Sequence, residues 1–276
     1  MMFSKTTSSL LLSSFLGLAA CGSSDTTGGT PGNEPTELIF ENKADEPRFS
    51  PDSATIAFVQ SKGAMDGADL SVMDVSGNQR KALSPASDFM AAPAWAPDGK
   101  QIYFVSDDGV SVVPVAGGTA TVAAKAFAVL DPDVSPDGKS LVYAVNGSSL
   151  QLVDLANPAT SKDLGTNGTS PRFSPDGKSI AFESGDKIKL MDIASLMVTE
   201  VVDGGTYLAS VDWFSDGKRL AISSDKGIEI VTLGATPSRA LVHDEFAAMN
   251  VDVSPDGKLI AYTVNGQKSI FVLSGF

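Results

Sequence analysis

An aspartate recurs six times along this sequence in a short segment resembling Ser174-Pro175-Asp176-Gly177, and it is the most frequent group that could do chemistry. The six residues are Asp52, Asp98, Asp137, Asp176, Asp216 and Asp256. A calcium site gathers about six to eight oxygen ligands in one place, whereas these carboxylates are about 40 residues apart. Serine, proline, aspartate and glycine in this order suit a tight turn. We therefore interpret the aspartates as turn residues and expect no metal site.

Side chains for acid–base or nucleophilic catalysis are few. His243 is the only histidine and Cys21 is the only cysteine. The Gly-x-Ser-x-Gly segment that carries the nucleophile of α/β hydrolases is absent from the sequence, and zinc sites usually recruit several histidines or cysteines. We interpret His243 as a surface loop residue between the fifth and sixth repeat units. The sequence thus predicts a non-enzymatic protein without metal or cofactor.

The repeated turn defines the elements that position the other residues. In the fourth copy, Phe173 ends one run, and Ile180 alternating with Phe182 begins the next with the period of a strand. The copies recur about every 40 residues, and each unit holds four strand-like stretches, which in the fourth unit are 171–174, 179–183, 187–193 and 198–202. This period and strand number are typical of a propeller blade. We predict an all-β fold, a single six-bladed β-propeller with four antiparallel strands per blade.

The two ends of the repeat region are incomplete in complementary ways. The sixth unit has residues only for its third strand, at 269–273, while a strand pattern at 37–41 precedes the first unit. We predict that 37–41 pairs with 269–273 and closes the ring, which removes an exposed sheet edge. Burial of Leu38 and Phe40 should then contribute about 1.5 to 3 kcal/mol each.

Six positions that precede the turns by two residues are expected to lie on the innermost strands and to face one another around the axis. They are Arg48, Ala94, Asp133, Arg172, Asp212 and Asp252. Ring order places Arg172 between Asp133 and Asp212, and closure brings Arg48 beside Asp252. The set is either a group of ion pairs between blades or a charged channel mouth that binds a small polar ligand or a peptide terminus.

The longer connections into the innermost strands carry apolar side chains. Phe89, Phe127, Tyr207 and Phe246 all lie in these connections, and so do Met90 and Met249. Aromatic and methionine side chains on the loops of one face are typical of a protein-binding patch. They could equally fold over the blades as a lid.

The N-terminal region is distinct from the repeats. An apolar run over 10–20 is too short to span a bilayer and fits a signal peptide at 1–20. Residues 21–36 are rich in Gly, Ser, Thr and Pro, and they indicate a flexible tether before a propeller at 37–276.

Two resemblances add to these expectations. The segment Leu18-Ala19-Ala20-Cys21-Gly22 resembles the lipobox of bacterial lipoproteins, which implies lipidation of Cys21, membrane anchoring and, in a Gram-negative cell, the outer membrane facing the periplasm. The repeats resemble the WD-like repeat of TolB-type propellers, which also occurs in propellers attached to prolyl oligopeptidase-type peptidases. That family usually carries a further domain, and the tether takes its place here.

Charge and resemblance together favour a binding function. A formal net charge of -13 excludes a nucleic-acid partner, because phosphate binding depends on clustered basic residues. We expect a monomeric, non-enzymatic envelope lipoprotein whose propeller binds or scaffolds an envelope protein or peptide. The alternative is a carbohydrate- or peptide-active enzyme, or a small-ligand binder, that uses acidic residues at the channel mouth.

Overall fold

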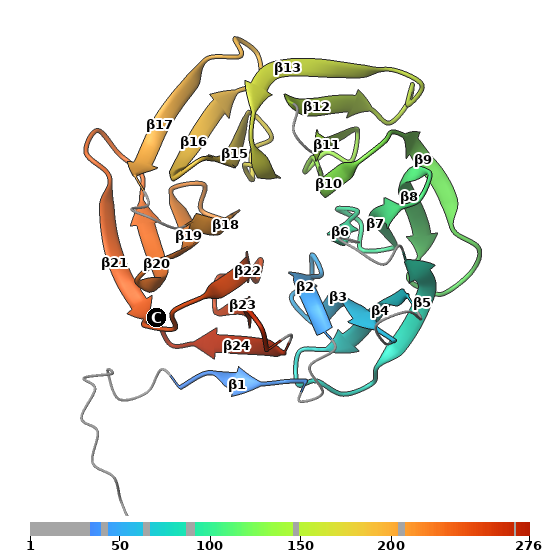
Figure 1. Ribbon diagram of the computed structural model, residues 1–276, viewed down its shortest axis with the longest axis horizontal. Coiled ribbons are helices and arrows are strands. Elements are labelled where there is room, and N and C mark those ends of the chain that lie inside the picture. The colour runs from blue at the N-terminus through green and yellow to red at the C-terminus, as the bar shows by residue number, and fades with distance from the viewer. Residues whose placement is uncertain are drawn as a thin grey trace, which may run out of the picture.

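The computed structural model describes residues 34–39, 44–62, 67–86, 92–145, 149–203, 208–267 and 269–276. They form six four-stranded antiparallel sheets arranged as blades around a central axis (Figure 1). The prediction of a six-bladed all-β propeller is confirmed. No helix of the described residues is both long and apolar enough to cross a membrane.

Each of the first five blades takes its four strands consecutively from the chain, from the axis outward. The first blade comprises β2 (Ala44–Phe49), β3 (Thr55–Ser61), β4 (Ala68–Asp74) and β5 (Lys81–Ala86). The second comprises β6 (Ala94–Trp95), β7 (Gln101–Ser106), β8 (Gly109–Pro114) and β9 (Thr121–Lys125). The third comprises β10 (Val129–Val134), β11 (Ser140–Val145), β12 (Ser149–Asp154) and β13 (Ser161–Asn167).

The remaining blades continue this order until the chain ends. The fourth comprises β14 (Thr169–Phe173), β15 (Ser179–Ser184), β16 (Lys187–Asp192) and β17 (Val198–Asp203). The fifth comprises β18 (Leu208–Trp213), β19 (Arg219–Ser224), β20 (Gly227–Thr232) and β21 (Ser238–His243). The sixth comprises β22 (Ala248–Val253), β23 (Leu259–Val264), β24 (Ile270–Ser274) and, from the other end of the chain, β1 (Thr36–Glu37).

The repeated turn is held by its own side chains. In the fourth blade, the Ser174 hydroxyl donates to Asp176 Oδ1 over 2.6 Å and accepts from the amide of Ser179 over 3.0 Å. The Gly177 amide closes the turn on the Ser174 carbonyl over 2.8 Å, and its φ of 69° is one that glycine adopts without strain. These contacts fix the direction of both flanking strands, so the role of the aspartate is to stabilise the turn.

The hydrophobic core lies between adjacent blades. Ile180 and Phe182 of β15 are fully buried and pack against Val142 and Leu150 of the third blade. Each blade repeats this arrangement with its own second strand, so the core is a ring of interfaces. Bulky residues alternate with alanines such as Ala181, which allows the blades to approach near the axis.

The ring closes where the sequence predicts. Thr36 and Glu37 of β1 pair with Val272 and Phe271 of β24, and the Leu38 amide donates to the Ile270 carbonyl over 2.8 Å. Leu38 is 6% exposed and Ile39 is fully buried. The closing strand begins one residue earlier than predicted, and Phe40 and Glu41 lie outside the described residues. The predicted burial of Leu38 is therefore confirmed, and Ile39 is buried beside it.

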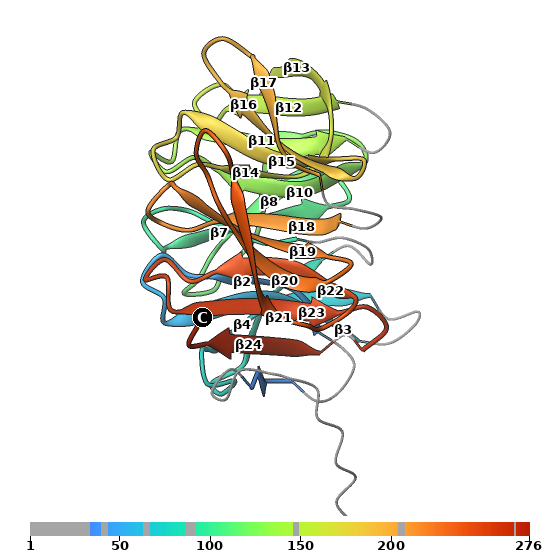
Figure 2. The same ribbon diagram turned by 90° about the vertical axis from the view of Figure 1, so that its left-hand side faces the viewer.

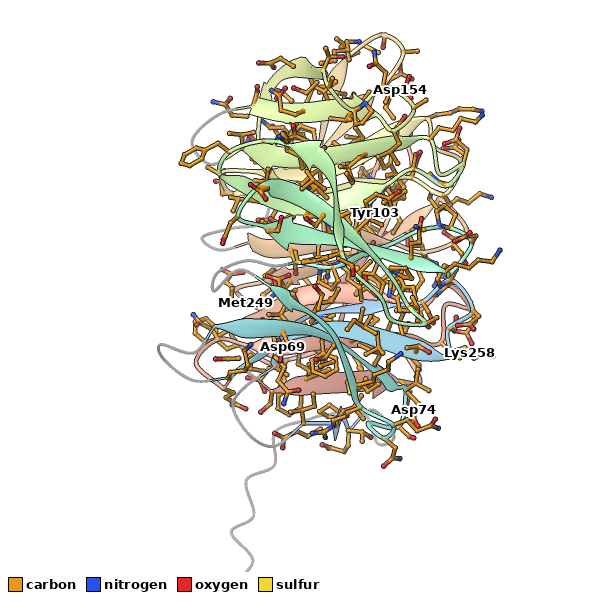
Figure 3. The ribbon with its side chains drawn as sticks, turned by 90° about the vertical axis from the view of Figure 1, so that its right-hand side faces the viewer. Asp69, Asp74, Tyr103, Asp154, Met249 and Lys258 are labelled. Carbon is orange, nitrogen blue, oxygen red and sulfur yellow. The ribbon has the colours of Figure 1, made fainter. Side chains whose placement is uncertain are left out.

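The propeller has two unlike faces, which the side views show (Figures 2 and 3). The turn face carries the six repeated turns and the links between third and fourth strands; Lys258, Asp74 and Asp154 lie there. The loop face carries the links between second and third strands and the connections between blades, with Met249 beside it.

Candidate functional site

Bulges in the innermost strands place polar residues along the channel. The register shifts once in each of β2, β10, β14 and β22. The shifted segments contain residues with positive φ that are not glycine, namely Glu46, Asp131, Ser170 and Asn250. Such conformations cost about 1 to 3 kcal/mol each and cluster at functional sites. A bulge also changes the direction in which a side chain points. We call these four residues the inner layer of the channel.

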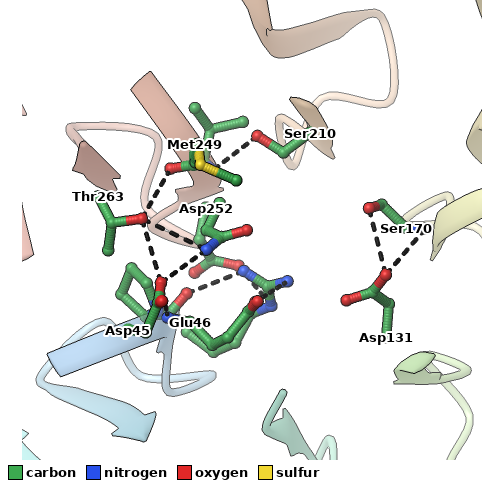
Figure 4. A network of polar contacts seen from close by, with 12 residues as sticks. Asp45, Glu46, Asp131, Ser170, Ser210, Met249, Asp252 and Thr263 are labelled. Carbon is green, nitrogen blue, oxygen red and sulfur yellow. Dashed lines mark hydrogen bonds and ion pairs between the residues drawn. The ribbon is translucent and has the colours of Figure 1, made fainter. Parts of the chain in front are cut away.

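The inner layer links blades by hydrogen bonds (Figure 4). Ser170 donates its amide and its hydroxyl to Asp131 Oδ2 over 3.2 and 3.4 Å. Asn250 Nδ2 donates to Asp45 Oδ1 over 2.8 Å, which joins the last blade to the first. The inner layer was missed by the sequence analysis, although polar residues stand two positions before most members of the predicted ring.

A cavity of about 360 Å³ opens on the axis at the turn face. All six innermost strands contribute to it, so it is the mouth of the central channel. Its charged lining comprises all five charged residues predicted for the ring, Arg48, Asp133, Arg172, Asp212 and Asp252. Its apolar lining includes Trp95, Trp213, Phe49, Phe173 and the turn prolines.

Each of the three ring aspartates connects its own blade to the next one by accepting a hydrogen bond from a backbone amide of that blade. Asp133 Oδ2 accepts a hydrogen bond from the amide of Phe173 over 2.7 Å. Asp212 and Asp252 accept in the same way from Val253 and Phe49, over 2.7 and 2.6 Å. These bonds hold the three carboxylates in fixed positions around the mouth.

The two ring arginines behave differently. Arg48 lies beside Asp252 as predicted, with 3.8 Å between Nε and Oδ1, and its Nη2 is 3.8 Å from Glu46 Oε2. Arg172 makes no ion pair with any described residue. Its Nη1 donates to the Pro171 carbonyl over 2.8 Å, and its buried Nε has no partner. The interpretation as inter-blade ion pairs therefore fits Arg48 and does not describe Arg172.

Burial shifts the protonation of the channel carboxyls. It raises the pKa of Glu46 to about 8, with repulsion from Asp131 as the next cause. It also raises the pKa of Asp133 and of Glu183 to about 7 and that of Asp212 to about 6, while Arg48 moderates the effect on both aspartates. The pKa values of these carboxyls therefore lie well above the usual range of aspartate and glutamate. Glu183, at the fourth blade's second strand, was not predicted as part of this cluster.

Two phenylalanines project from the loop face. Phe127 is 90% exposed between β9 and β10, and Phe246 is 70% exposed between β21 and β22. Each is followed by an alanine with positive φ, Ala128 at 55° and Ala247 at 73°. In both links, therefore, a residue in the left-handed region directly follows the exposed phenylalanine. Phe89 and Tyr207 lie outside the described residues, as does Cys21.

His243 is placed differently from the prediction. It is the last residue of β21 and is half-buried, with its ring centroid 5.8 Å from that of Tyr262. Its Nε2 is buried and has no hydrogen-bond partner among the described residues. No group of three or more metal-ligating side chains was found in the part of the chain that the structure describes.

Comparisons with known proteins agree on the fold. TolB from Acinetobacter baumannii superposes with a TM-score of 0.63 at 24% identity, over 81% of this chain and 64% of that chain. Hydrazine synthase from Kuenenia stuttgartiensis gives 0.64 at 20% identity, over 90% and 80%. The uncharacterized peptidase YuxL of Bacillus subtilis is 34% identical over 62 residues, which is 22% of this chain and 9% of that protein. No family model matches the sequence.

The chain thus spans under two thirds of the TolB chain and a small part of the peptidase. At these identities the structural likeness bears on architecture and leaves activity open. The predicted resemblance is confirmed at that level: the chain has the six-bladed β-propeller fold that is also found in TolB.

Proposed function

We propose that this protein is a non-enzymatic protein-binding module of the bacterial cell envelope, and that its loop face takes the partner. The observation that carries the proposal is the pair Phe127 and Phe246, whose rings are 90% and 70% exposed. They precede the third and the sixth blades, three blades apart, and so stand on opposite sides of the channel. Exposed aromatic side chains are typical anchors of protein interfaces.

The charges of the loop face indicate the chemistry of the partner. Its exposed acidic residues are Asp107, Asp108, Asp186 and Asp244. The exposed lysines among the described residues there are Lys62, Lys125 and Lys226, and the charge of Lys62 is offset by its ion pair with Asp69. On the turn face, by contrast, each turn aspartate of blades two to six is accompanied by a lysine or arginine in an ion pair. A partner with apolar side chains and a basic surface would complement the loop face.

Membrane attachment is the second part of the proposal. Cleavage before Cys21 would leave a lipidated cysteine, and several acyl chains on one residue anchor a protein stably. The propeller's N-terminal strand β1 is the outermost strand of the last blade (Figure 1). A lipid-anchored tether that joins the propeller at this rim leaves both the turn face and the loop face open to partners. We place the protein at the outer membrane, facing the periplasm, if the cell is Gram-negative.

The test is crosslinking and affinity purification of the intact lipoprotein from its own membranes. Wild type is compared with F127S/F246S and with a control, M197S/L241S. Met197 and Leu241 are 65% and 52% exposed and lie in the β16–β17 link and on rim strand β21, away from the loop face. We expect one reproducible partner in wild type and control, and about tenfold less of it with the loop-face variant. Equal recovery from both variants, or no reproducible partner, would contradict the proposal.

A further inference from the structure

The six blades form two groups of three around the channel. The first and fourth blades place Arg-Phe in the cavity lining, the second and fifth a tryptophan, and the third and sixth Asp-Val. The tryptophans act alike: Trp95 Nε1 donates to the Arg48 carbonyl over 3.0 Å, and Trp213 Nε1 to the Arg172 carbonyl over 3.2 Å. The mouth therefore has an approximate two-fold symmetry, in which Arg48 and Arg172 occupy equivalent positions.

The symmetry fails at the partners of the arginines. Glu46 stands two residues before Arg48 and lies 3.8 Å from it, whereas the equivalent residue in the fourth blade is Ser170. Arg172 is only 4% exposed, yet no described carboxylate lies within ion-pair distance of it. Arg48 thus has two carboxyl groups within ion-pair distance, those of Glu46 and Asp252, and Arg172 has none among the described residues.

A buried guanidinium without a counter-charge is costly, because it has lost its hydration and gained nothing comparable. The edge of Arg172 that carries Nη1 is taken by the Pro171 carbonyl, and Nε on the other side has no partner. A carboxylate is the group that pairs best with a guanidinium, since two parallel hydrogen bonds can form. The unpartnered arginine therefore indicates a ligand with a carboxylate.

A simple anion does not suit the rest of the cavity. Asp133 and Asp212 line it from the blades on either side of Arg172. Both are fixed by backbone amides of the following blade, so neither is free to move away from an anion. A ligand that carries a positive group beside its carboxylate removes this repulsion and uses these aspartates as acceptors.

We propose that the cavity binds a small zwitterion of the amino-acid class, either a free amino acid or a short peptide. Its carboxylate pairs with Arg172, and its ammonium group lies against Asp133 or Asp212. The volume of about 360 Å³ falls in the usual range of ligand pockets, about 300 to 1,000 Å³. Phe173 and Trp213 provide an apolar wall beside Arg172. This site is on the opposite face from the surface proposed for the protein partner and does not depend on that proposal.

The test is isothermal titration calorimetry with L-leucine, alanyl-alanine and trialanine, which differ in the separation of their two charges. N-acetyl-alanyl-alanine and alanyl-alanine amide each lack one charge. We expect at least one of the three zwitterions to bind below about 10 mM, and blocking either end of alanyl-alanine, if it binds, to weaken it by at least about tenfold. The best binder identifies whether a free amino acid or a peptide fits.

Two variants test the assignment to Arg172 by different routes. R172M removes the guanidinium, and S170E places in the fourth blade the carboxylate that the first blade has at Glu46. We expect each to weaken binding by at least about tenfold, with folding checked by circular dichroism. K178M, at an exposed lysine of the same blade, should bind like wild type. Absence of binding by all three zwitterions, equal binding of the blocked peptides, or unchanged affinity in folded R172M and S170E would overturn the proposal.

Discussion

Closure of the ring by the N-terminal strand should account for a measurable part of the stability. Ile39 is fully buried in a cluster with Phe49, Ile56 and Phe58 of the first blade and Ile270 of the last. I39A should therefore leave a cavity between those blades and lower the free energy of unfolding by about 2 to 5 kcal/mol. For a domain of this size, 1 kcal/mol shifts Tm by about 2 to 4 °C. A loss near 3 kcal/mol thus corresponds to about 6 to 12 °C.

The assay is thermal unfolding followed by circular dichroism, supported by urea titration. L241A is the matched control, because Leu241 is 52% exposed on a rim strand and its truncation should change stability by less than about 0.5 kcal/mol. A chain that begins at Lys43 lacks the whole closing strand and should melt lower than one that begins at Gly22. The reasoning is refuted if I39A and L241A have the same Tm, or if the two chain lengths do.

Two further changes test the channel carboxyls and the strand pairing. Burial raises the pKa of Asp133 and Glu183 to about 7, so between about pH 4 and 7 the folded protein binds more protons than the unfolded one. The free energy of unfolding should fall as pH rises through 7: Tm should be lower at about pH 8.5 than at about pH 5.5, and E183Q should reduce the difference. An equal or higher Tm at the alkaline pH contradicts this. Gly227 has φ 115°, and a Cβ there would lie 2.1 Å from the His243 carbonyl oxygen. G227A should thus lower Tm strongly, whereas G234A, where a Cβ meets nothing within 4 Å, should leave it nearly unchanged; similar melting of the two would show that the link tolerates a side chain.

The fold could be predicted from the sequence because one local signal repeats. Ser174-Pro175-Asp176-Gly177 specifies a turn through contacts among its own residues, so the pattern reveals it without knowledge of the fold. Its spacing then gives the number of blades, and the incomplete ends give the closing strand. The bounds of that strand were less predictable, since β1 begins at Thr36, one residue before the apolar pattern starts.

The site could be predicted only in part, because its contacts join residues far apart in the chain. The position of Arg48 beside Asp252 followed from ring order. The lack of an ion-pair partner for Arg172 did not follow, because equivalent positions in two blades predict equivalent contacts. The two blades differ two residues earlier, where the first has Glu46 and the fourth has Ser170. The bulges that place Glu46 and Asp131 along the channel are register shifts between neighbouring strands. The alternation of apolar residues in the sequence does not reveal such shifts. Similarly, His243 ends a strand although its surroundings in sequence are those of a loop.

The central claim, that the loop face binds a protein, is tested most directly by site-specific photocrosslinking in intact cells. A photoreactive amino acid replaces Phe127, Phe246 or, as the control on the other face, Met197, and crosslinked species are identified by mass spectrometry. The account predicts that positions 127 and 246 crosslink to the same protein and that position 197 does not. Equal crosslinking from position 197, or none from either loop-face position, would contradict it.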